Sequence, residues 1–149
     1  MAASWLREVV HGVLTETECQ LLATRVGYLQ FTDILLAPVL SAIWSVVPVS
    51  LGEPAYCRVE ARPAGHPWHM DTGTKGHMAW CRYSARVLLD APDMFSGGGL
   101  YFRDEPDIAI FAYTDLVIYS NDDPLNEHVV ARSRGDRRVL LMFMGGLDG

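Results

Sequence analysis

The chain has 149 residues, half of them hydrophobic, and its 12 Lys and Arg residues against 18 Asp and Glu residues give a formal net charge of −6. A chain of this length buries roughly 70% of its unfolded surface, enough for one hydrophobic core, and its composition excludes disordered, collagen-like and repeat proteins. The acidic balance argues against a general nucleic-acid or membrane-surface binder, because phosphate-rich partners favour a basic face.

The cysteines and the N-terminal residues bear on the cellular compartment. The three cysteines lie far apart in the sequence and form no CxxC pair, which favours reduced thiols over a disulfide framework or a zinc knuckle. Arg7 and Glu8 stand where a signal peptide needs an uncharged apolar run, so the sequence predicts no signal peptide. We therefore expect a single cytoplasmic domain over residues 1–149, a monomer without nucleic-acid or membrane partners.

Helical signals dominate the first 50 residues. Thr15 and Glu18 form a capping box, in which the threonine hydroxyl and the glutamate carboxylate satisfy backbone N–H groups at a helix start. This motif predicts a helix that runs from there to about Gly27.

Residues 34–52 form an uncharged stretch that is nearly long enough to span a bilayer. Pro38 and Pro48 interrupt it, and apolar side chains recur along one face at helical spacing. We interpret the stretch as a buried helix that begins near Pro38, with a membrane span as the less favoured alternative. The expected apolar face comprises Leu36, Leu40, Ile43, Trp44 and Val47.

From Tyr56 onward the pattern changes to short runs of β-forming residues separated by Gly, Pro, Asn and Asp clusters. The predicted strands are 58–61, 84–90, 100–102, 108–113, 116–119, 128–130 and 137–143. Short strands that follow helices predict a mainly β fold, a sandwich or barrel over about residues 56–145, with a helical part over about 15–50 packed on one sheet.

A pair of histidines and one aspartate form a candidate metal site. His69 and Asp71 are two residues apart, so on an extended segment their side chains share one face. Such a triplet is common by chance, but His128 begins another predicted strand and supplies a second imidazole. Two imidazoles and one carboxylate can occupy one face of an octahedral ion, as in non-haem Fe(II) sites, and leave three positions open. The alternative for each histidine alone is a hydrogen-bonded core or loop residue.

An arginine stands at the head of the last apolar strand. Burial of Arg137 would be costly unless it met a carboxylate, preferably in bidentate geometry. A dicarboxylate co-substrate that chelates a metal through its keto acid end would present its far carboxylate there. The alternatives are a solvated strand-end charge and Arg138, which would point to the opposite face of the strand.

The order and spacing of these residues resemble the Fe(II)- and 2-oxoglutarate-dependent dioxygenases, most closely their prolyl 4-hydroxylase-like branch. The similarity extends over about residues 9–145. The matching segments are VHGVLTETEC at 10–19, EARPAGHPWHMD at 60–71, RYSARVLLD at 82–90, SGGGLYF at 96–102 and HVV at 128–130, followed by Gly135, Arg137 and Phe143.

This resemblance implies a double-stranded β-helix, or jelly roll, buttressed by two or three α-helices. It implies that His69, Asp71 and His128 bind Fe(II) and are catalytic, and that Arg137 binds the C5 carboxylate of 2-oxoglutarate. Dioxygen would be the second co-substrate and ascorbate the reductant. The implied reaction hydroxylates a C–H bond, foremost of a prolyl residue in a peptide or protein, with release of succinate and CO2. The alternatives are a hydroxylase of a free amino acid or small metabolite, and a non-catalytic, cupin-like jelly roll that binds a metal or a peptide.

The sequence departs from the family pattern beside the expected co-substrate. Leu88 and Leu141 stand where relatives often place a tyrosine and a threonine, so either another group assists Arg137 or 2-oxoglutarate binds less tightly. The residues considered for the co-substrate pocket are Ser84, Arg86 and Leu100, with Tyr83, Tyr101 and Tyr119 as further donors. Residues expected at the substrate are Trp68, Trp80 and Arg82, and His66 and His77 either orient a polar group or lie on surface loops.

Overall fold

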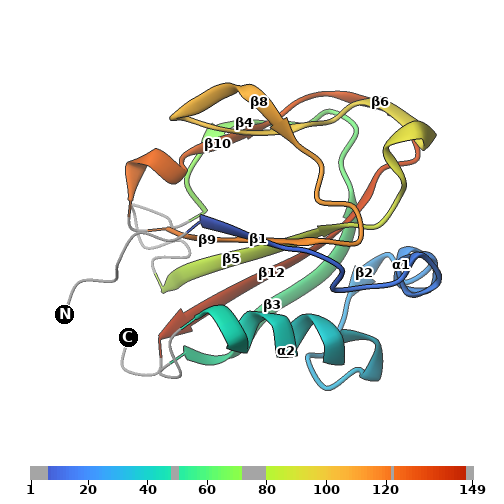
Figure 1. The fold of residues 1–149 in the computed structure, drawn as a ribbon, viewed down its shortest axis with the longest axis vertical. Coiled ribbons are helices and arrows are strands. Elements are labelled where there is room, and N and C mark those ends of the chain that lie inside the picture. The colour runs from blue at the N-terminus through green and yellow to red at the C-terminus, as the bar shows by residue number, and fades with distance from the viewer. Residues whose placement is uncertain (1–6, 48–50, 72–79, 122, 147–149) are drawn as a thin grey trace.

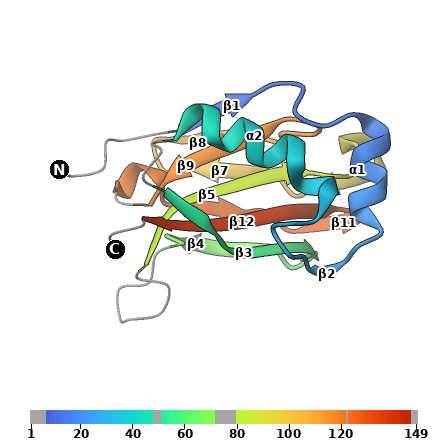
Figure 2. The same cartoon turned by 90° about the horizontal axis from the view of Figure 1, so that it is seen from below.

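The computed structural model describes residues 7–47, 51–71, 80–121 and 123–146. Its two main antiparallel sheets face each other (Figure 1). The two α-helices lie on the outer face of the larger sheet, and Figure 2 shows one of them crossing that sheet. The candidate metal ligands lie between the sheets. The mainly β fold with N-terminal helices is therefore confirmed.

The larger sheet has six strands in the order β1-β9-β5-β12-β3-β2. Their bounds are β1 Arg7–Val10, β9 Leu116–Ser120, β5 Cys81–Leu88, β12 Arg138–Gly146, β3 Leu51–Ala61 and β2 Gly27–Tyr28. The smaller sheet has the order β4-β10-β7-β8, with bounds His66–His69, His128–Val130, Leu100–Phe102 and Glu105–Ile110. A third pair joins β6, Phe95–Gly97, to β11, Ser133–Gly135. From β3 onward the chain passes back and forth between the two main sheets, which gives the predicted jelly roll.

Helix α1, Glu16–Ala23, begins at the predicted capping box. The Thr15 N–H donates to Glu18 Oε1 at 2.9 Å, and the Glu18 N–H donates to Thr15 Oγ1 at 3.0 Å. The predicted end at Gly27 was wrong. The Thr24 hydroxyl donates to the Leu21 carbonyl and closes the helix, and Gly27 already pairs with β3 as part of β2.

Helix α2 spans Ala37–Val46, close to the predicted start at Pro38, and follows a 3-10 turn over Ile34–Leu36. Its buried face differs slightly from the predicted one, because Val39 is fully buried and Trp44 is 40% exposed. Within the described residues, no helix combines the length and the apolar character that crossing a bilayer requires.

The strand prediction was correct for the core strands and incomplete at the edges. Predicted strands 100–102 and 128–130 match β7 and β10, but predicted strand 108–113 ends early, at Ile110. Ala112 and Thr114 have positive φ angles of 37° and 62°, which take the backbone out of the extended region. Five short strands were not predicted, because their sequences do not alternate between apolar and polar residues: β1, β2, β4, β6 and β11.

Alternation along β5 separates two sides of the larger sheet. Tyr83, Ala85 and Val87 pack with the helices in the main hydrophobic core. Arg86 and Leu88 point the other way, toward the smaller sheet, where a second cluster forms around Phe102 and Tyr119. The inner face of the larger sheet therefore carries polar side chains into the space between the sheets.

The three cysteines are buried free thiols. Burial raises the pKa of Cys19 to about 11 and that of Cys57 and Cys81 to about 12. Because the thiolate is the reactive form, we expect native protein at pH 8 to react slowly with a thiol reagent and to expose three reactive thiols only on unfolding. Fast labelling of one cysteine in the native protein would contradict this burial.

Candidate metal centre and adjoining cavity

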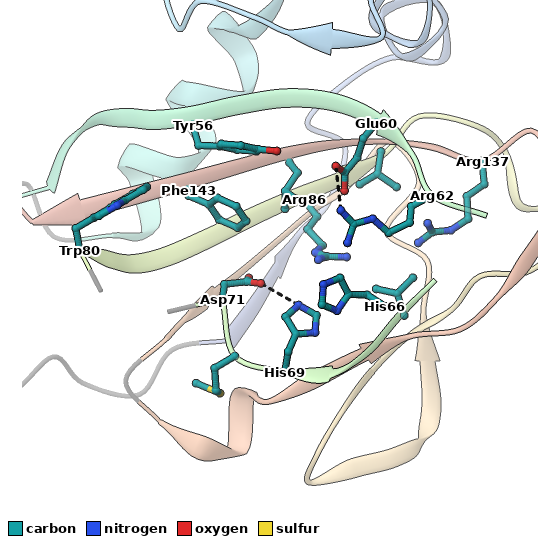
Figure 3. Close-up of a pocket in the computed structure, with 14 residues that line it drawn as sticks. Tyr56, Glu60, Arg62, His66, His69, Asp71, Trp80, Arg86, Arg137 and Phe143 are labelled. Carbon is teal, nitrogen blue, oxygen red and sulfur yellow. Dashed lines mark hydrogen bonds and ion pairs between the residues drawn. The ribbon is translucent and has the colours of Figure 1, made fainter. Parts of the chain in front are cut away.

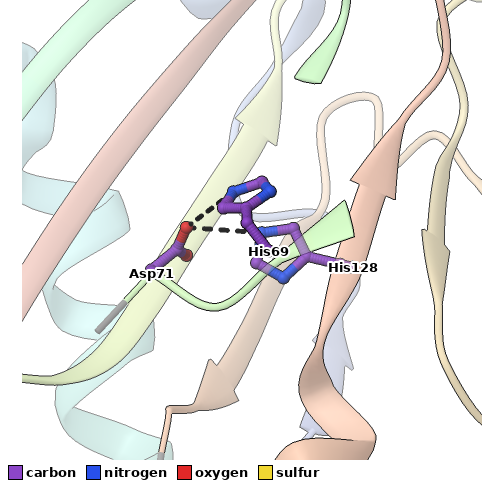
Figure 4. Close-up of side chains that lie close together, drawn as sticks. All are labelled: His69, Asp71 and His128. Atoms are coloured by element: carbon purple, nitrogen blue, oxygen red, sulfur yellow. Dashed lines mark hydrogen bonds and ion pairs between the residues drawn. The ribbon is translucent and has the colours of Figure 1, made fainter. Parts of the chain in front are cut away.

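Cross-strand pairing brings the two histidines together. His69 ends β4 and His128 begins β10, and the two residues are register partners in the smaller sheet. Directly opposed side chains of an antiparallel pair lie on the same face with their Cβ atoms about 5 Å apart. Asp71 follows β4 by two residues and turns its carboxylate toward both imidazoles (Figure 4).

The three side chains meet the geometry of a common ion. Nε2 of His69 lies 3.2 Å from Asp71 Oδ1, and Nε2 of His128 lies 3.3 Å from the same oxygen. All three donor atoms lie within 4.8 Å of one another. Two ligand atoms about 2.1 Å from an ion and at right angles are roughly 3 Å apart, so the trio can occupy one face of an octahedron.

Backbone carbonyls fix the tautomer of both imidazoles. Nδ1 of His69 lies 2.7 Å from the Pro67 carbonyl oxygen, and Nδ1 of His128 lies 2.9 Å from the Asn126 carbonyl oxygen. A carbonyl only accepts, so each Nδ1 carries the proton and each Nε2 turns its lone pair toward the centre. Burial lowers the pKa of His128, which keeps this imidazole neutral at pH 7. The histidines are thus held in the form that binds a metal.

The carboxylate of Asp71 is held by a second group of side chains. Its second oxygen, Oδ2, accepts a hydrogen bond from Tyr119 Oη at 2.8 Å, and Arg86 Nε donates to the same phenol at 3.2 Å. Burial raises the pKa of Tyr119 far above its ordinary value, so the phenol keeps its proton. Burial also opposes ionisation of Asp71, but contacts with His128 and His69 and the charge of Arg86 outweigh it and hold its pKa well below the usual range. One oxygen is thereby aimed at the histidines.

We expect Tyr119→Phe to weaken metal binding by about 10- to 100-fold, because groups that orient a ligand typically contribute that much. The substitution removes the hydrogen bond to Asp71 and leaves the ring packed against Phe102. Titration with Co(II), followed by its visible absorption, measures the affinity. Tyr28→Phe, at a phenol that is 72% exposed, is the matched control. Unchanged affinity in Tyr119→Phe would show that Asp71 needs no such support.

A cavity of about 490 Å³ adjoins the three side chains (Figure 3). It lies between β3 and β12 of the larger sheet and β4 of the smaller one. Two of the candidate ligands, His69 and Asp71, line it. Its other polar lining comprises Glu60, Arg62, His66, Arg86 and Arg137, and its apolar lining includes Tyr56, Trp80, Val139, Leu141 and Phe143.

The structure distinguishes the two adjacent arginines. Arg138 is paired with Asp90, with Nε 2.9 Å from Oδ2 and Nη2 2.7 Å from Oδ1, on the outer side of the sheet. Arg137 faces the cavity, and its buried Nε has no hydrogen-bond partner among the described residues. Burial, followed by repulsion from Arg86, lowers the pKa of Arg137 to about 10. An unpaired guanidinium in a cavity is a site for an anion.

Gly98 makes room for Arg137. It adopts φ +76°, and a Cβ at this position would lie 2.5 Å from Arg137 Cδ. The glycine-rich turn before β7 therefore allows the close approach that keeps the guanidinium in the cavity.

The other residues expected near a co-substrate have different surroundings. Leu100 and Arg86 line a smaller hollow with Arg137, so both lie beside it. Ser84 is buried and accepts a hydrogen bond from Asn121 Nδ2 at 2.9 Å, and it is not among the residues that line the cavity. Tyr83 packs in the core beneath the helices, away from the cavity.

Of the residues expected at the substrate, the structure places Trp80 in the cavity wall. Trp68 and Arg82 are exposed and do not line the cavity; Arg103 lies over the Trp68 ring, 4.5 Å from its centroid. His66 does line it, with its ring centroid 3.7 Å from that of His69. His77 lies outside the described residues.

Sequence reasoning missed two charged residues of the cavity. Glu60 and Arg62 project from the end of β3 onto the inner side, opposite the core residues Cys57 and Val59. The alternation of apolar and charged residues in this strand was the available signal. It shows which side chains share a face, but the face that meets the cavity depends on the second sheet.

The arrangement of the two main sheets is a fold that solved 2-oxoglutarate- and Fe(II)-dependent oxygenases share, among them prolyl hydroxylases. The viral collagen prolyl hydroxylase of Paramecium Bursaria Chlorella virus-1, solved with 2-oxoglutarate, matches with a TM-score of 0.69 and 10% identity over 94% of this chain and 95% of that one. A prolyl-4-hydroxylase of Pseudomonas putida matches with a TM-score of 0.66 and 15% identity over 96% and 93%.

A 2OG-Fe(II) oxygenase-family oxidoreductase of Burkholderia pseudomallei matches more distantly, with a TM-score of 0.52 and 15% identity over 77% of this chain and 54% of that one. No protein-family model and no curated protein sequence matches the chain. At these identities the likeness is one of fold, and it confirms the fold that the sequence resemblance implied.

Proposed function

We propose that the protein is an Fe(II)- and 2-oxoglutarate-dependent dioxygenase that hydroxylates a C–H bond. One observation carries the proposal. A His-Asp-His trio is arranged to bind one face of a metal ion, and two of its members, His69 and Asp71, line the same cavity as Arg137, whose buried Nε has no hydrogen-bond partner among the described residues. A cupin-like protein that only bound a metal would have no use for this arginine.

In this proposal His69, Asp71 and His128 hold Fe(II). Two neutral imidazoles and one carboxylate match the preference of this ion for mixed nitrogen and oxygen ligands, and three protein ligands leave positions for a chelating keto acid and dioxygen. The hydrogen bonds of Pro67 and Asn126 to the imidazoles and of Tyr119 to the carboxylate hold the ligands in place without rearrangement.

Arg137 binds the C5 carboxylate of 2-oxoglutarate, and Leu100 and Arg86 line the smaller hollow beside it. Ser84 would act indirectly, through its neighbours. When bound, the iron, the keto acid and dioxygen supply an oxidant that hydroxylates the substrate as the keto acid is converted to succinate and CO2. Ascorbate is the proposed reductant. The apolar side chains of Leu141 and Phe143 keep water away from this part of the cavity.

For the substrate we propose first a prolyl residue of a peptide or protein, as the names of the two prolyl hydroxylases of similar fold suggest. Trp80 offers a flat wall on which a pyrrolidine ring can pack, and Trp68 and Arg82 would contact flanking parts of a longer substrate. A free amino acid or small metabolite is the second candidate, favoured by the number of charged groups in the cavity. We also propose that residues 1–149 act as one domain, in the cytoplasm and as a monomer.

Release of succinate from 2-oxoglutarate, with Fe(II) and ascorbate present, tests the proposed function. Peptides and metabolites are then screened for the mass gain of one oxygen atom. We expect succinate formation that depends on Fe(II) and increases with a true substrate. Tight metal binding without 2-oxoglutarate binding or succinate would instead support the non-catalytic jelly roll.

A further inference from the structure

The cavity contains more positive than negative side chains. Three arginines line it, Arg62, Arg86 and Arg137, against two carboxylates, Glu60 and Asp71. In the proposed function Asp71 and the keto acid carboxylate match the two charges of Fe(II), and the C5 carboxylate matches Arg137. Glu60 lies 4.0 Å from Arg62 and matches one more charge. One guanidinium therefore remains without a counter-charge.

The surroundings of Arg86 indicate that the unmatched positive charge of the cavity is balanced by a bound ligand. The Arg86 side chain lies among the strands of the larger sheet and opens onto the cavity. Its one hydrogen-bond partner in the described part of the chain is the neutral phenol of Tyr119, at 3.2 Å. No carboxylate of the described residues forms an ion pair with Arg86, and Asp71 and Glu60 act on its charge only at longer range. A guanidinium that is removed from water without a directly paired anion is unfavourable, so a bound anion would stabilise it.

Arg62 enters the same cavity from its mouth. It follows the end of β3, its side chain is 47% exposed, and its contact with Glu60 is long for an ion pair. Figure 3 shows Arg62 and Arg86 both pointing into the middle of the cavity, with Arg137 at one end. Two guanidinium groups from different segments of the chain can hold one carboxylate by parallel N–H donors.

We propose that Arg62 and Arg86 bind a carboxylate group of the substrate. This inference rests on the proposed function and specifies its substrate class: a compound whose carboxylate lies near the carbon that is hydroxylated. Such a carboxylate belongs either to a free amino acid or similar small acid, or to the C-terminal residue of a peptide. The aromatic and aliphatic walls at Trp80, Leu141 and Phe143 take the apolar part of the molecule. A prolyl residue inside a chain offers only a neutral carbonyl there.

Pairs of acids and their amides test the proposal directly. Free proline is compared with prolinamide, and a short peptide that ends in proline is compared with its C-terminal amide. Binding is measured by calorimetry to Zn(II)-loaded protein with 2-oxoglutarate, and hydroxylation by mass in the Fe(II) enzyme. We expect the acid of at least one pair to bind about tenfold or more tightly than its amide, the effect of one hydrogen-bonded charge pair. The pair that shows this preference identifies the source of the carboxylate.

Two variants assign the effect to the named residues. Arg62→Gln removes one charge at an exposed position, and Arg86→Lys keeps the charge but removes the planar fork, so that each reduces the preference for the acid to less than about threefold. Arg134→Gln, at an exposed residue of β11, is the matched control and keeps the preference.

Three results would overturn the proposal: equal binding of acid and amide in both pairs, no binding of either while 2-oxoglutarate binds, or an undiminished preference in both variants. Failure of 2-oxoglutarate itself to bind is a different outcome, which removes the proposed function and this inference with it.

Discussion

We expect Asp71→Ala to abolish the Fe(II)-dependent formation of succinate, and we expect the same result for His128→Ala. Either change leaves two ligands where three are needed to hold the ion on one face. The loss of Asp71 also removes the anion that offsets one charge of the ion and leaves the Tyr119 hydroxyl without its acceptor. Both effects weaken metal binding, and we expect turnover below detection at any practical Fe(II) concentration.

Metal binding and turnover are measured separately, by Co(II) absorption and by succinate release. Asp107→Ala, at an exposed carboxylate of β8, is the control and keeps full activity. We expect Co(II) and Ni(II) to bind the unaltered protein and to compete with Fe(II), because the affinity order places both above Fe(II). We expect neither ion to support turnover. Succinate production retained in both ligand variants would exclude these residues as the iron site.

The sequence was sufficient to locate the candidate metal centre because its proposed ligands have a local signature. His69 and Asp71 share a face through the two-residue period of an extended chain, and that period does not depend on the rest of the fold. The match to His128 came from its position at the start of a predicted strand, and the register of β4 with β10 agrees with it. The capping box at Thr15 was predictable for the same reason, because its two hydrogen bonds lie within one turn.

Contacts between distant strands were not predictable in this way. The chain Arg86, Tyr119, Asp71 joins β5, β9 and the segment after β4, and it exists only because Ser84 pairs with Tyr119 in the larger sheet. Sequence reasoning proposed both Arg86 and Tyr119 as donors to the co-substrate but had no means of connecting them. The missing edge strands have a similar cause, because β1 is defined by its pairing with β9 and not by its own residues.

Arg137→Ala lowers the affinity for 2-oxoglutarate by about a hundredfold or more, the second large effect we expect. A partly buried, bidentate arginine–carboxylate pair loses on the order of 3–5 kcal/mol when one partner is removed, since the other charge is left without compensation. The unaltered protein already tolerates an uncompensated group at this place, because the Nε of Arg137 is buried without a hydrogen-bond partner in the described part of the chain. We therefore expect Arg137→Ala to keep its fold while it loses co-substrate binding. Calorimetry with Zn(II)-loaded protein measures the affinity without turnover.

Arg138→Ala separates this effect from a general loss of positive charge. Arg138 donates to Asp90 through its backbone N–H and its side chain, on the side of the sheet away from the cavity. Its removal should reduce thermal stability and leave 2-oxoglutarate affinity within about threefold of the original, because no charge in the cavity changes. If Arg137→Ala also changed the 2-oxoglutarate affinity by less than about threefold, the co-substrate carboxylate would be assigned to Arg86 instead. The cavity would then have its unmatched charge at Arg137, and the substrate carboxylate would bind at that end.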